Sequence, residues 1–220
     1  RLPMDGTMTA EYEYRQRQMK DFAKKLGNAP ISNYDAYIVY ECRYRAMIRY
    51  PLDVTHFTPN QCNTLQKPVI DALLPKIGLN RKTPRVVIYG PMSLGGMEIM
   101  DLRLEQVVRQ WETTRGHMCR EDRVGQGLLL TLNDHQCIIG SETVFLNNDP
   151  NRYNYGVRNT RWKFIWESMW ENNLTVELYD NWVPKRNADN DVNIMDRATC
   201  DPVLVSSKWP MLEHVNRCRL

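Results

Sequence analysis

Apolar residues recur at helical spacing through the first part of the chain. Segment 9–26 places Met19, Ala23 and Leu26 on one face, and this spacing predicts an amphipathic helix. Its acidic residues come early and its lysines late, which suits the helix dipole. We expect Gly27 to end this helix in a left-handed conformation.

The next two apolar segments each begin with a helix start signal. Ser32 and Asp35 have the spacing of a capping box and open a helix that we expect Pro51 to stop. Tyrosines at positions 37, 40 and 44 share one face of this helix. Thr58 and Gln61 form a second capping box, with a proline at the first helical position between them, and predict a third helix.

Residues 73–96, LLPKIGLNRKTPRVVIYGPMSLGG, interrupt the helical pattern. They hold four cations, four glycines and three prolines around one short apolar run, VVIY. Because proline and glycine end helices and make turns, we expect the third helix to end near Pro75 and Gly78 and an exposed loop to follow over 80–85. VVIY then forms either a short buried strand or an anchor across the core.

A fourth helix follows this stretch. Asp101 stands where a cap is expected, and we assign the inward face to four apolar residues of the segment behind it. These residues are Leu104, Val107, Val108 and Trp111.

The second half of the chain continues the helical pattern with more interruptions. RVGQGLLLTLND resembles a helix start, and Trp162, Ile165, Trp166 and Met169 recur at helical spacing. LTVELYDNW is the best strand candidate of this half. The polar run LNNDPNRYNYG lies within 145–160 and predicts a hinge. We therefore expect a mainly α fold with one or two short strands and two subdomains, residues 1–145 and 146–220.

Composition narrows the class of protein. With 220 residues and 42% hydrophobic content, the chain can bury a sizeable core without staples. Its apolar runs are far shorter than the roughly 20 residues needed to cross a bilayer, so we predict no membrane partner. Six cysteines lack any C-x-x-C pair, which indicates reduced thiols and an intracellular protein, nuclear or cytoplasmic. The net charge of +3 divides into +6 for residues 1–120 and −3 for the remainder.

No complete catalytic or metal site can be read from the sequence. His117 with Cys119 and His135 with Cys137 offer zinc ligands, but an H-x-C pair strains to reach one ion. We interpret them as thiols beside imidazoles. Residues 189–193, DNDVN, imitate the start of a calcium loop without its glycine and final glutamate. Hydrolase, zincin and phosphate-loop motifs are absent.

Four cations form the candidate binding site. Lys76, Arg81, Lys82 and Arg85 lie within ten residues. Basic side chains on a loop held by prolines can contact the phosphates of a nucleic acid, with release of counterions. The alternative is a loop that is charged only because it is solvated. The sequence leaves both interpretations open.

The order of the segments carries a family resemblance. EYEYRQRQMKDFAKKL, then AMIRYPL, then CNTLQKPVIDALLPKIGLNRKTPRVVIYGPMSLGGMEIMDL resembles the region that follows the palm in retrotransposon-encoded reverse transcriptase domain proteins. RLPMDG, IMDRA and LEHVNRCRL resemble flanking elements of that family, and the similarity is thin over 115–185. The residues that match the family's central element are Leu74, Pro75, Lys76, Gly78, Asn80, Arg81, Pro84, Arg85, Tyr89, Gly90, Pro91, Gly95 and Gly96.

The resemblance implies a function without chemistry. Such a region is a helical, thumb-like part that packs on the palm and holds the primer–template duplex of RNA and DNA. The family's metal-binding aspartates, including a Tyr-x-Asp-Asp turn, belong to the palm, which is absent here. We therefore expect both ends of the chain to be truncated, no catalytic residue and no cofactor in it, and magnesium only in the missing palm.

A second interpretation comes from another class of protein. The chain could be a decayed or domesticated remnant of such an element that acts as a helical protein-interaction scaffold. Its docking face would be the tryptophan-rich helix at 162–170, although Trp and Met at helical spacing are more often core residues. A zinc enzyme built on the histidine and cysteine pairs is a distant third.

Overall fold

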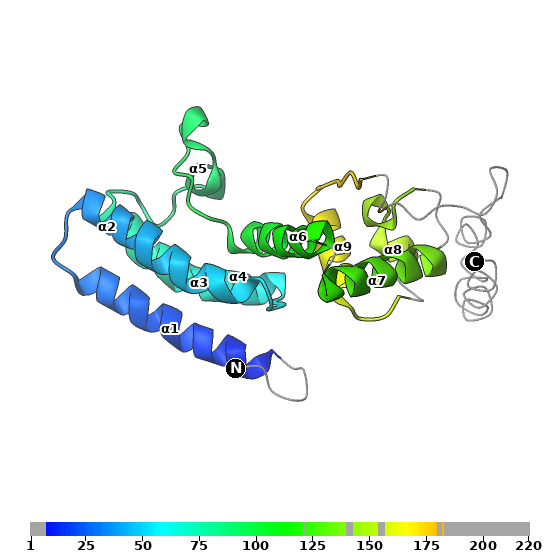
Figure 1. The fold of residues 1–220 in the computed structure, drawn as a ribbon. Helices are drawn as coiled ribbons and strands as arrows, with labels where there is room; N and C mark the ends of the chain where they lie inside the picture. The colour runs from blue at the N-terminus through cyan, green and yellow to red at the C-terminus, as the bar shows by residue number, and fades with distance from the viewer. Residues whose placement is uncertain (1–7, 121, 140–142, 154–156, 180–181, 183–220) are drawn as a thin grey trace. The chain divides into compact units, whose positions relative to one another are not determined.

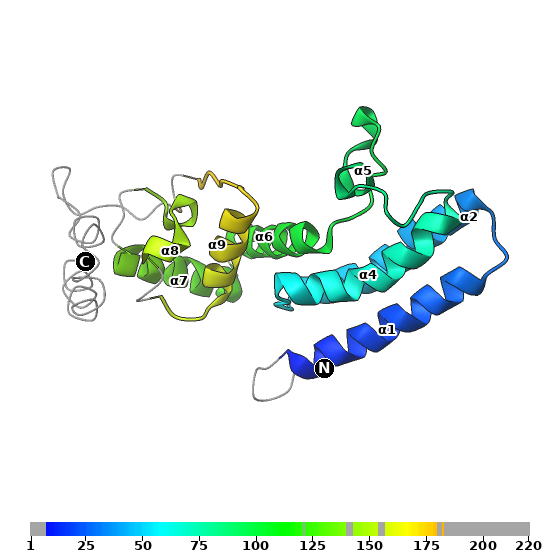
Figure 2. The ribbon, with the colours of Figure 1, turned by 180° about the vertical axis from the view of Figure 1, so that it is seen from behind.

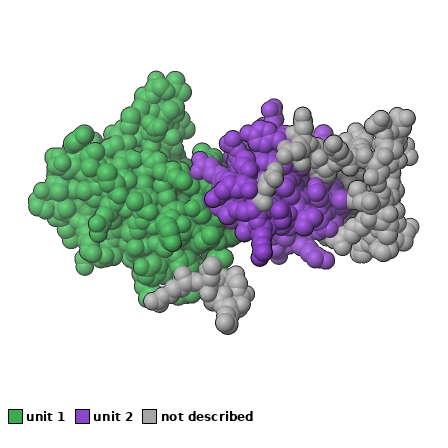
Figure 3. Space-filling view, viewed as in Figure 1, with its two compact units in different colours: residues 1–110 green, residues 111–220 purple. Residues whose placement is uncertain are grey.

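The computed structural model describes residues 8–120, 122–139, 143–153, 157–179 and 182. In these residues the protein is mainly α-helical, which confirms the predicted class. The chain divides into two compact units, residues 1–110 and 111–220, which Figure 3 distinguishes by colour. RLPMDG, IMDRA, LEHVNRCRL and the loop at 189–193 lie outside the described residues.

Unit 1 is built on three long helical segments that lie side by side: α1 and α4 run in the same direction, and the segment from α2 to α3 runs in the opposite direction. Figures 1 and 2 show α1 running beside α4, with the continuous rod of α2, η1 and α3 packed on α4, whereas α5 stands away from these helices. The elements are α1 (Thr9–Asn28), α2 (Asn33–Val39), the π-helical η1 (Tyr40–Arg45), α3 (Ala46–Leu52), α4 (Pro59–Lys76), α5 (Arg85–Tyr89), the 3₁₀ turn η2 (Met92–Leu94) and the start of α6 (Leu102–Arg120).

Helix α1 forms as predicted but ends differently. Met19, Ala23 and Leu26 are buried, so the apolar face is confirmed. Gly27 does not adopt a left-handed conformation; the helix continues to Asn28, and Ala29 ends it in an extended conformation with φ −69° and ψ 132°. The reason is local, because Pro30 follows Ala29 and a residue before proline is driven out of the helical region.

One of the two predicted capping boxes is complete. The Ser32 hydroxyl accepts the backbone N–H of Asp35 at 3.1 Å and donates to Asp35 Oδ2 at 2.7 Å, so Ser32 is an N-cap without the predicted return bond. At the head of α4, Thr58 Oγ1 accepts from the Gln61 N–H at 3.3 Å while Gln61 Oε1 accepts from the Thr58 N–H at 2.9 Å. Pro51 lies inside the last turn of α3 and does not stop it, since the helix runs one residue further.

The rod of α2, η1 and α3 buries one residue in every four. The fully buried residues are Ala36, Tyr40, Tyr44, Ile48 and Leu52, each with 0% exposure. Four residues of an α-helix turn about 40° past a full circle, so four such intervals would carry Leu52 about 160° away from Ala36. The π-helical turn η1 takes up part of this drift, because its i→i+5 bonding places an extra residue in the turn.

VVIY is helical, so the strand alternative is wrong for it. Its residues form most of α5, with Pro84 as the preceding residue. The chain then reverses: Met97 N–H donates to Val87 O at 2.8 Å and Ile99 N–H to Ile88 O at 3.0 Å. The returning segment thus satisfies main-chain carbonyls of α5, which is too short to bond all of them within the helix.

Helix α6 buries amides where an apolar face is predicted. Val107 is buried, but Leu104 and Val108 are 41% and 39% exposed. In unit 1 the helix instead turns Gln106 and Gln110 inward, at 2% and 0% exposure. The assignment of the inward face is therefore wrong in part, and a polar set takes its place.

The buried glutamines hold the loops of unit 1 by their amide groups. Gln106 Nε2 donates to Phe57 O, and Gln106 Oε1 accepts from Phe57 N–H, both at 3.0 Å. Gln66 joins Met100 O and the Leu102 N–H in the same way. Each of these two side-chain amides bonds one N–H and one carbonyl of the main chain. It thus satisfies a buried donor and a buried acceptor that could not reach water.

Unit 2 packs short helices around two tryptophans. Trp162 and Trp166 are fully buried, and their indole N–H groups donate to Leu128 O at 2.9 Å and to Asn148 O at 2.7 Å. Phe145 meets Trp166 edge to face at 5.4 Å. The elements are the end of α6, α7 (Arg123–Ile139), the 3₁₀ turn η3 (Phe145–Asn147), α8 (Pro150–Tyr153) and α9 (Arg161–Glu171).

The division of the chain lies earlier than the predicted one at 145/146. The compact units separate between Gln110 and Trp111, within α6. The described residues of the polar run 145–160 belong to unit 2, where η3 packs against α9. Phe145 and Leu146, at the start of this run, are core residues of unit 2.

LTVELYDNW is not a strand in its described residues. Residues 174–179 are irregular. Asn147 Nδ2 donates to Val176 O, and Asn147 Oδ1 accepts from Val176 N–H, both at 2.9 Å. One side-chain amide thus pairs with the only buried residue of the segment's start, and no neighbouring strand is needed.

The structure adds one observation on membrane spans and one on the cysteines. Within the described ranges, no helix combines the length and apolar character needed to cross a membrane. Cys42, Cys62, Cys119 and Cys137 are free thiols, and burial raises the pKa of the Cys62 thiol to about 12.

Candidate nucleic-acid interface

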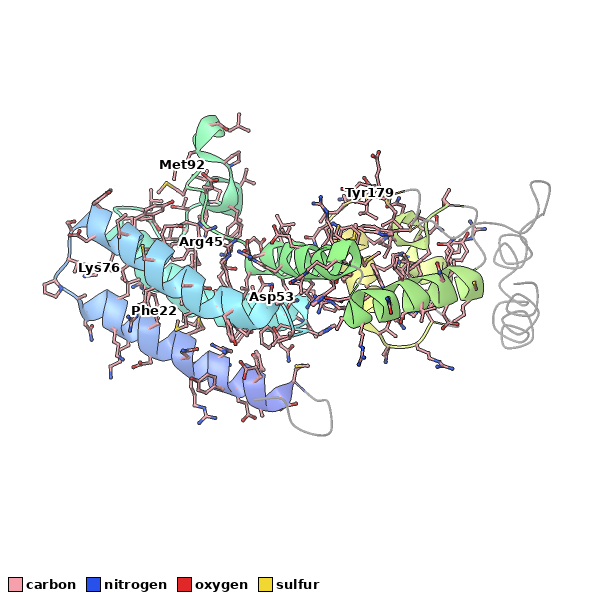
Figure 4. The ribbon with its side chains drawn as sticks, in the orientation of Figure 1. Phe22, Arg45, Asp53, Lys76, Met92 and Tyr179 are labelled. Atoms are coloured by element: carbon pink, nitrogen blue, oxygen red, sulfur yellow. The ribbon has the colours of Figure 1, made fainter. Side chains whose placement is uncertain are left out.

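The structure brings two of the four predicted cations, Lys76 and Arg81, to the lining of one hollow. Lys76 occupies the last turn of α4, Arg81 and Lys82 the loop behind it, and Arg85 the first position of α5. Figure 4 shows Lys76 near the connection from α1 to α2, and its Nζ donates to Ala29 O at 2.8 Å. The structure thus places this cation at the junction of two helix ends.

The loop that carries Arg81 and Lys82 is folded by its own hydrogen bonds. Gly78 takes φ +85°, which L residues rarely adopt, and the chain turns so that Leu79 N–H donates to Leu74 O at 2.8 Å. Asn80 then holds the turn: its Oδ1 accepts from Lys82 N–H at 2.8 Å and its carbonyl from the Thr83 hydroxyl at 2.6 Å. These bonds define the backbone from which the cations project.

In the part of the chain that the structure describes, no acidic side chain forms an ion pair with the cations of this loop. Arg81 Nε donates to Asp71 O, a main-chain carbonyl, at 3.1 Å. Arg85 Nη1 donates to Tyr89 Oη at 3.0 Å, and its guanidinium lies 5.8 Å from the centre of that ring. Lys82 is exposed, and its ammonium makes no hydrogen bond or ion pair with any described residue.

Several other arginines of unit 1 are paired with glutamates, whereas Arg17 Nε donates to the main-chain carbonyl of Glu13 at 3.4 Å. Arg15 pairs with Glu11, Arg45 with Glu41, and both Arg49 and Arg109 with Glu105. Among the described residues, none of the four candidate cations has such a partner. An unpaired arginine or lysine keeps its full charge for a ligand, whereas a paired one would first have to give up its glutamate.

The tip of the α5–η2 segment is a feature that the sequence analysis did not single out. Val86 and Leu94 are 83% and 85% exposed, and Met92, labelled in Figure 4, is 54% exposed. In the sequence, the signal that could have identified it is the occurrence of aliphatic residues among turn-forming prolines and glycines. The apolar tip follows directly on the cationic loop in the chain.

The tryptophan-rich helix does not offer the docking face assigned to it in the scaffold interpretation. Trp162 and Trp166 are fully buried and only Trp170 is exposed, at 42%. The core interpretation of these residues is confirmed. The scaffold function itself stays untested, but it would need another surface.

The histidines of the rejected zinc site have partners of other kinds. His117 Nδ1 lies 2.7 Å from Asp122 Oδ2. His135 Nδ1 lies 2.7 Å from Thr131 O and its Nε2 lies 2.9 Å from Thr160 Oγ1. Within the described ranges no group of three His, Cys, Asp or Glu side chains has the arrangement to hold a metal ion.

We expect unit 2 to lose stability as the pH falls below about 6.5. Burial lowers the pKa of His135, with Asp134 and Arg158 as its charged neighbours. Below the unfolded value of about 6.5 the unfolded chain therefore binds the extra proton, and the free energy of unfolding falls by at most about 1.4 kcal/mol per pH unit.

The measurement is denaturant unfolding between pH 5 and 7.5, followed by the fluorescence of the buried tryptophans. His135→Gln should remove this part of the pH dependence, because the group can no longer titrate. An equal slope in the variant and the natural protein would contradict the expectation.

Known proteins do not extend this picture. No protein-family model matches the chain, and no curated protein or solved structure gives a significant match. A nucleic-acid interface is therefore inferred from the cations and contacts described above and from the sequence resemblance.

Proposed function

We propose that this chain is a non-catalytic part of a retroelement reverse transcriptase and holds the primer–template duplex through its backbone phosphates. One observation carries the proposal: Lys76 and Arg81 line one hollow at the end of α4, and among the described residues none of Lys76, Arg81, Lys82 and Arg85 forms an ion pair with an acidic side chain. The helical fold of the segment agrees with the thumb-like region that the sequence resemblance implies.

The contacts suit phosphates better than bases. The cations project from a turn whose backbone is fixed by Asn80 and Gly78, so little backbone entropy is lost when they meet a ligand. Arginine presents a fork of N–H groups that matches phosphate oxygens. Contacts of this type position a duplex without reading its sequence.

In this function the chain itself makes and breaks no bond. Polymerase chemistry needs magnesium held by carboxylates, and the described residues do not supply such a group. The magnesium and the catalytic aspartates would belong to a palm, which is then a second partner besides the nucleic acid. The contribution of this chain would be the position of the duplex.

We expect the full chain to bind an RNA–DNA hybrid duplex with an affinity that falls steeply with salt and depends little on sequence. The triple variant Arg81→Ala, Lys82→Ala, Arg85→Ala removes up to three phosphate contacts. It should reduce the slope of log K against log salt by about 2 to 3. The measurement is fluorescence anisotropy of a labelled hybrid at several salt concentrations.

The matched control removes the same charge from other exposed positions of unit 1. Lys20, Arg43 and Lys67 are exposed cations outside the loop, and their replacement by alanine should change the slope much less. Equal effects of the two triple variants would mean that only net charge matters. Binding that ignores salt would contradict the proposal outright.

A helical scaffold is the second candidate, favoured by the exposed aliphatic tip of Val86, Met92 and Leu94. Large apolar side chains in such positions often mark protein contacts. The same anisotropy experiment separates the two: a scaffold would show no salt-dependent affinity for the hybrid. The tip would then be the surface to alter.

A further inference from the structure

A hollow lies between the C-terminal ends of α1 and α4. Its volume is about 360 Å³, within the range of small-ligand sites. Cations from three separate segments line it: Lys24 of α1, Lys76 of α4 and Arg81 of the following loop. One carboxylate, that of Asp71, also lines it, so positive charge prevails.

Two of these cations are fixed at the hollow by main-chain carbonyls. Lys76 Nζ donates to Ala29 O at 2.8 Å, which ties it to the connection behind α1. Arg81 donates through Nε to Asp71 O at 3.1 Å, and its terminal nitrogens make no hydrogen bond to a described residue. A guanidinium held in this way keeps its outer N–H groups for an anion.

Lys24 completes the set from the opposite helix. It is exposed and has no partner among the described residues, whereas its neighbour Lys25 pairs with Asp21 at 2.7 Å. Cations in the last turn of a helix are favoured by the helix dipole alone. The helix dipole explains why lysines lie in the last turns of α1. It does not explain why Lys24 and Arg81, which come from different segments, line the same hollow.

The wall of the hollow leaves room for an anion. Gly27 lines it, and a Cβ built on this glycine would meet no atom within 4 Å. Asn28 adds an amide side chain to the lining. Small residues beside cations let phosphate oxygens come within hydrogen-bond distance.

We propose that this hollow is a seat for a single phosphate group, held by Lys24, Lys76 and Arg81. The inference rests on the proposed function in so far as Lys76 and Arg81 belong to both. It adds Lys24 of α1 as a ligand, and it separates this seat from Lys82 and Arg85, which do not line the hollow. The phosphate could come from a nucleic-acid backbone or from a free phosphate ion.

The decisive variant is Lys24→Ala, because Lys24 lies outside the cationic loop. Loss of one charged hydrogen bond should weaken the binding of an RNA–DNA hybrid about tenfold, and Lys20→Ala and Lys67→Ala serve as controls on α1 and α4. The double variant Lys24→Ala, Arg81→Ala should lose less than the product of the two single losses, since both side chains would hold one phosphate.

A second arm titrates the full chain with inorganic phosphate and follows the Gly27 and Asn28 amide signals by NMR. Shifts that saturate in the natural protein and vanish in Lys24→Ala support the seat even if the hybrid does not bind, in which case the duplex-holding function fails and the seat serves free phosphate. Circular dichroism confirms that each variant is folded.

The inference is overturned if Lys24→Ala binds the hybrid like Lys20→Ala and inorganic phosphate leaves the Gly27 and Asn28 signals unchanged. If the hybrid nevertheless binds with the expected salt dependence, the duplex-holding function survives without this seat. The two failures are therefore distinguishable.

Discussion

Replacing Gly96 with alanine is expected to unfold the segment that contains α5 and η2. A Cβ on Gly96 would lie 2.1 Å from Gly90 O and 2.3 Å from Gly90 C, closer than any real contact. The obstacle is backbone, so no rotamer change can relieve it. We expect a loss of about 3 kcal/mol or more, from the segment alone or from unit 1 as a whole.

Hydrogen exchange is the suitable measurement for Gly96→Ala. The amides of Met97 and Ile99 donate to Val87 O and Ile88 O in the natural protein, and these amides should lose protection. Gly27→Ala is the control, because nothing lies within 4 Å of its Cβ and the residue is helical. It should stabilise α1 by about 1 kcal/mol. Unchanged protection in Gly96→Ala would show that the segment does not depend on the close approach of Gly90 and Gly96.

Replacing Gln106 with leucine is expected to destabilise unit 1 by about 3 kcal/mol. The side chain is 2% exposed and bonds both the N–H and the carbonyl of Phe57. Leucine is similar in size but leaves this buried donor and acceptor without partners, at a cost of about 1 to 3 kcal/mol each. Some of that loss is offset by the burial of more apolar surface.

Denaturant unfolding of the full chain measures the effect of Gln106→Leu. Gln16→Leu on α1 is the matched control, because Gln16 is only partly buried, and a change within about 0.5 kcal/mol is expected there. If Gln106→Leu were equally neutral, the loop at Phe57 would have to find water or another partner. The loop would then not depend on the amide.

The parts of the fold that the sequence predicts are those fixed by near neighbours. Thr58 and Gln61 are three residues apart, so their capping box can be read directly and is present. Pro30 could have predicted the extended Ala29 by the same kind of local rule. Met19 and Leu26 belong to a long periodic segment, and their burial follows from it.

The parts that the sequence does not predict depend on distant partners. Gln106 appears polar in any pattern, and only the approach of Phe57 from another segment makes it a core residue. A short apolar run such as VVIY has no distinctive period, so its state is decided by the returning chain at Met97 and Ile99. The stretch after Leu174 similarly depends on the amide of Asn147.

The candidate site likewise has a part that the sequence predicts and a part that depends on distant partners. Lys76, Arg81, Lys82 and Arg85 are close in the sequence, so their cluster needs no fold to be seen. Lys24 joins them only because α1 packs along α4. A site assembled from two helices gives no signal in a single sequence beyond the presence of one more lysine.

The π-helical turn η1 also determines which changes of length this rod can tolerate. A π-helical turn holds one residue more than an α-helical turn, so removing one residue between Tyr40 and Arg45 would let the rod wind as an uninterrupted α-helix with its later side chains close to their present directions. Ile48 would then stand eleven residues after Ala36, about 20° past three full turns, and would stay in the interior. An inserted residue would instead rotate every later side chain by about 100° in α-helical geometry and carry Ile48 and Leu52, now fully buried, out of the interior. Over evolutionary time the rod should therefore tolerate a deletion at η1 better than an insertion.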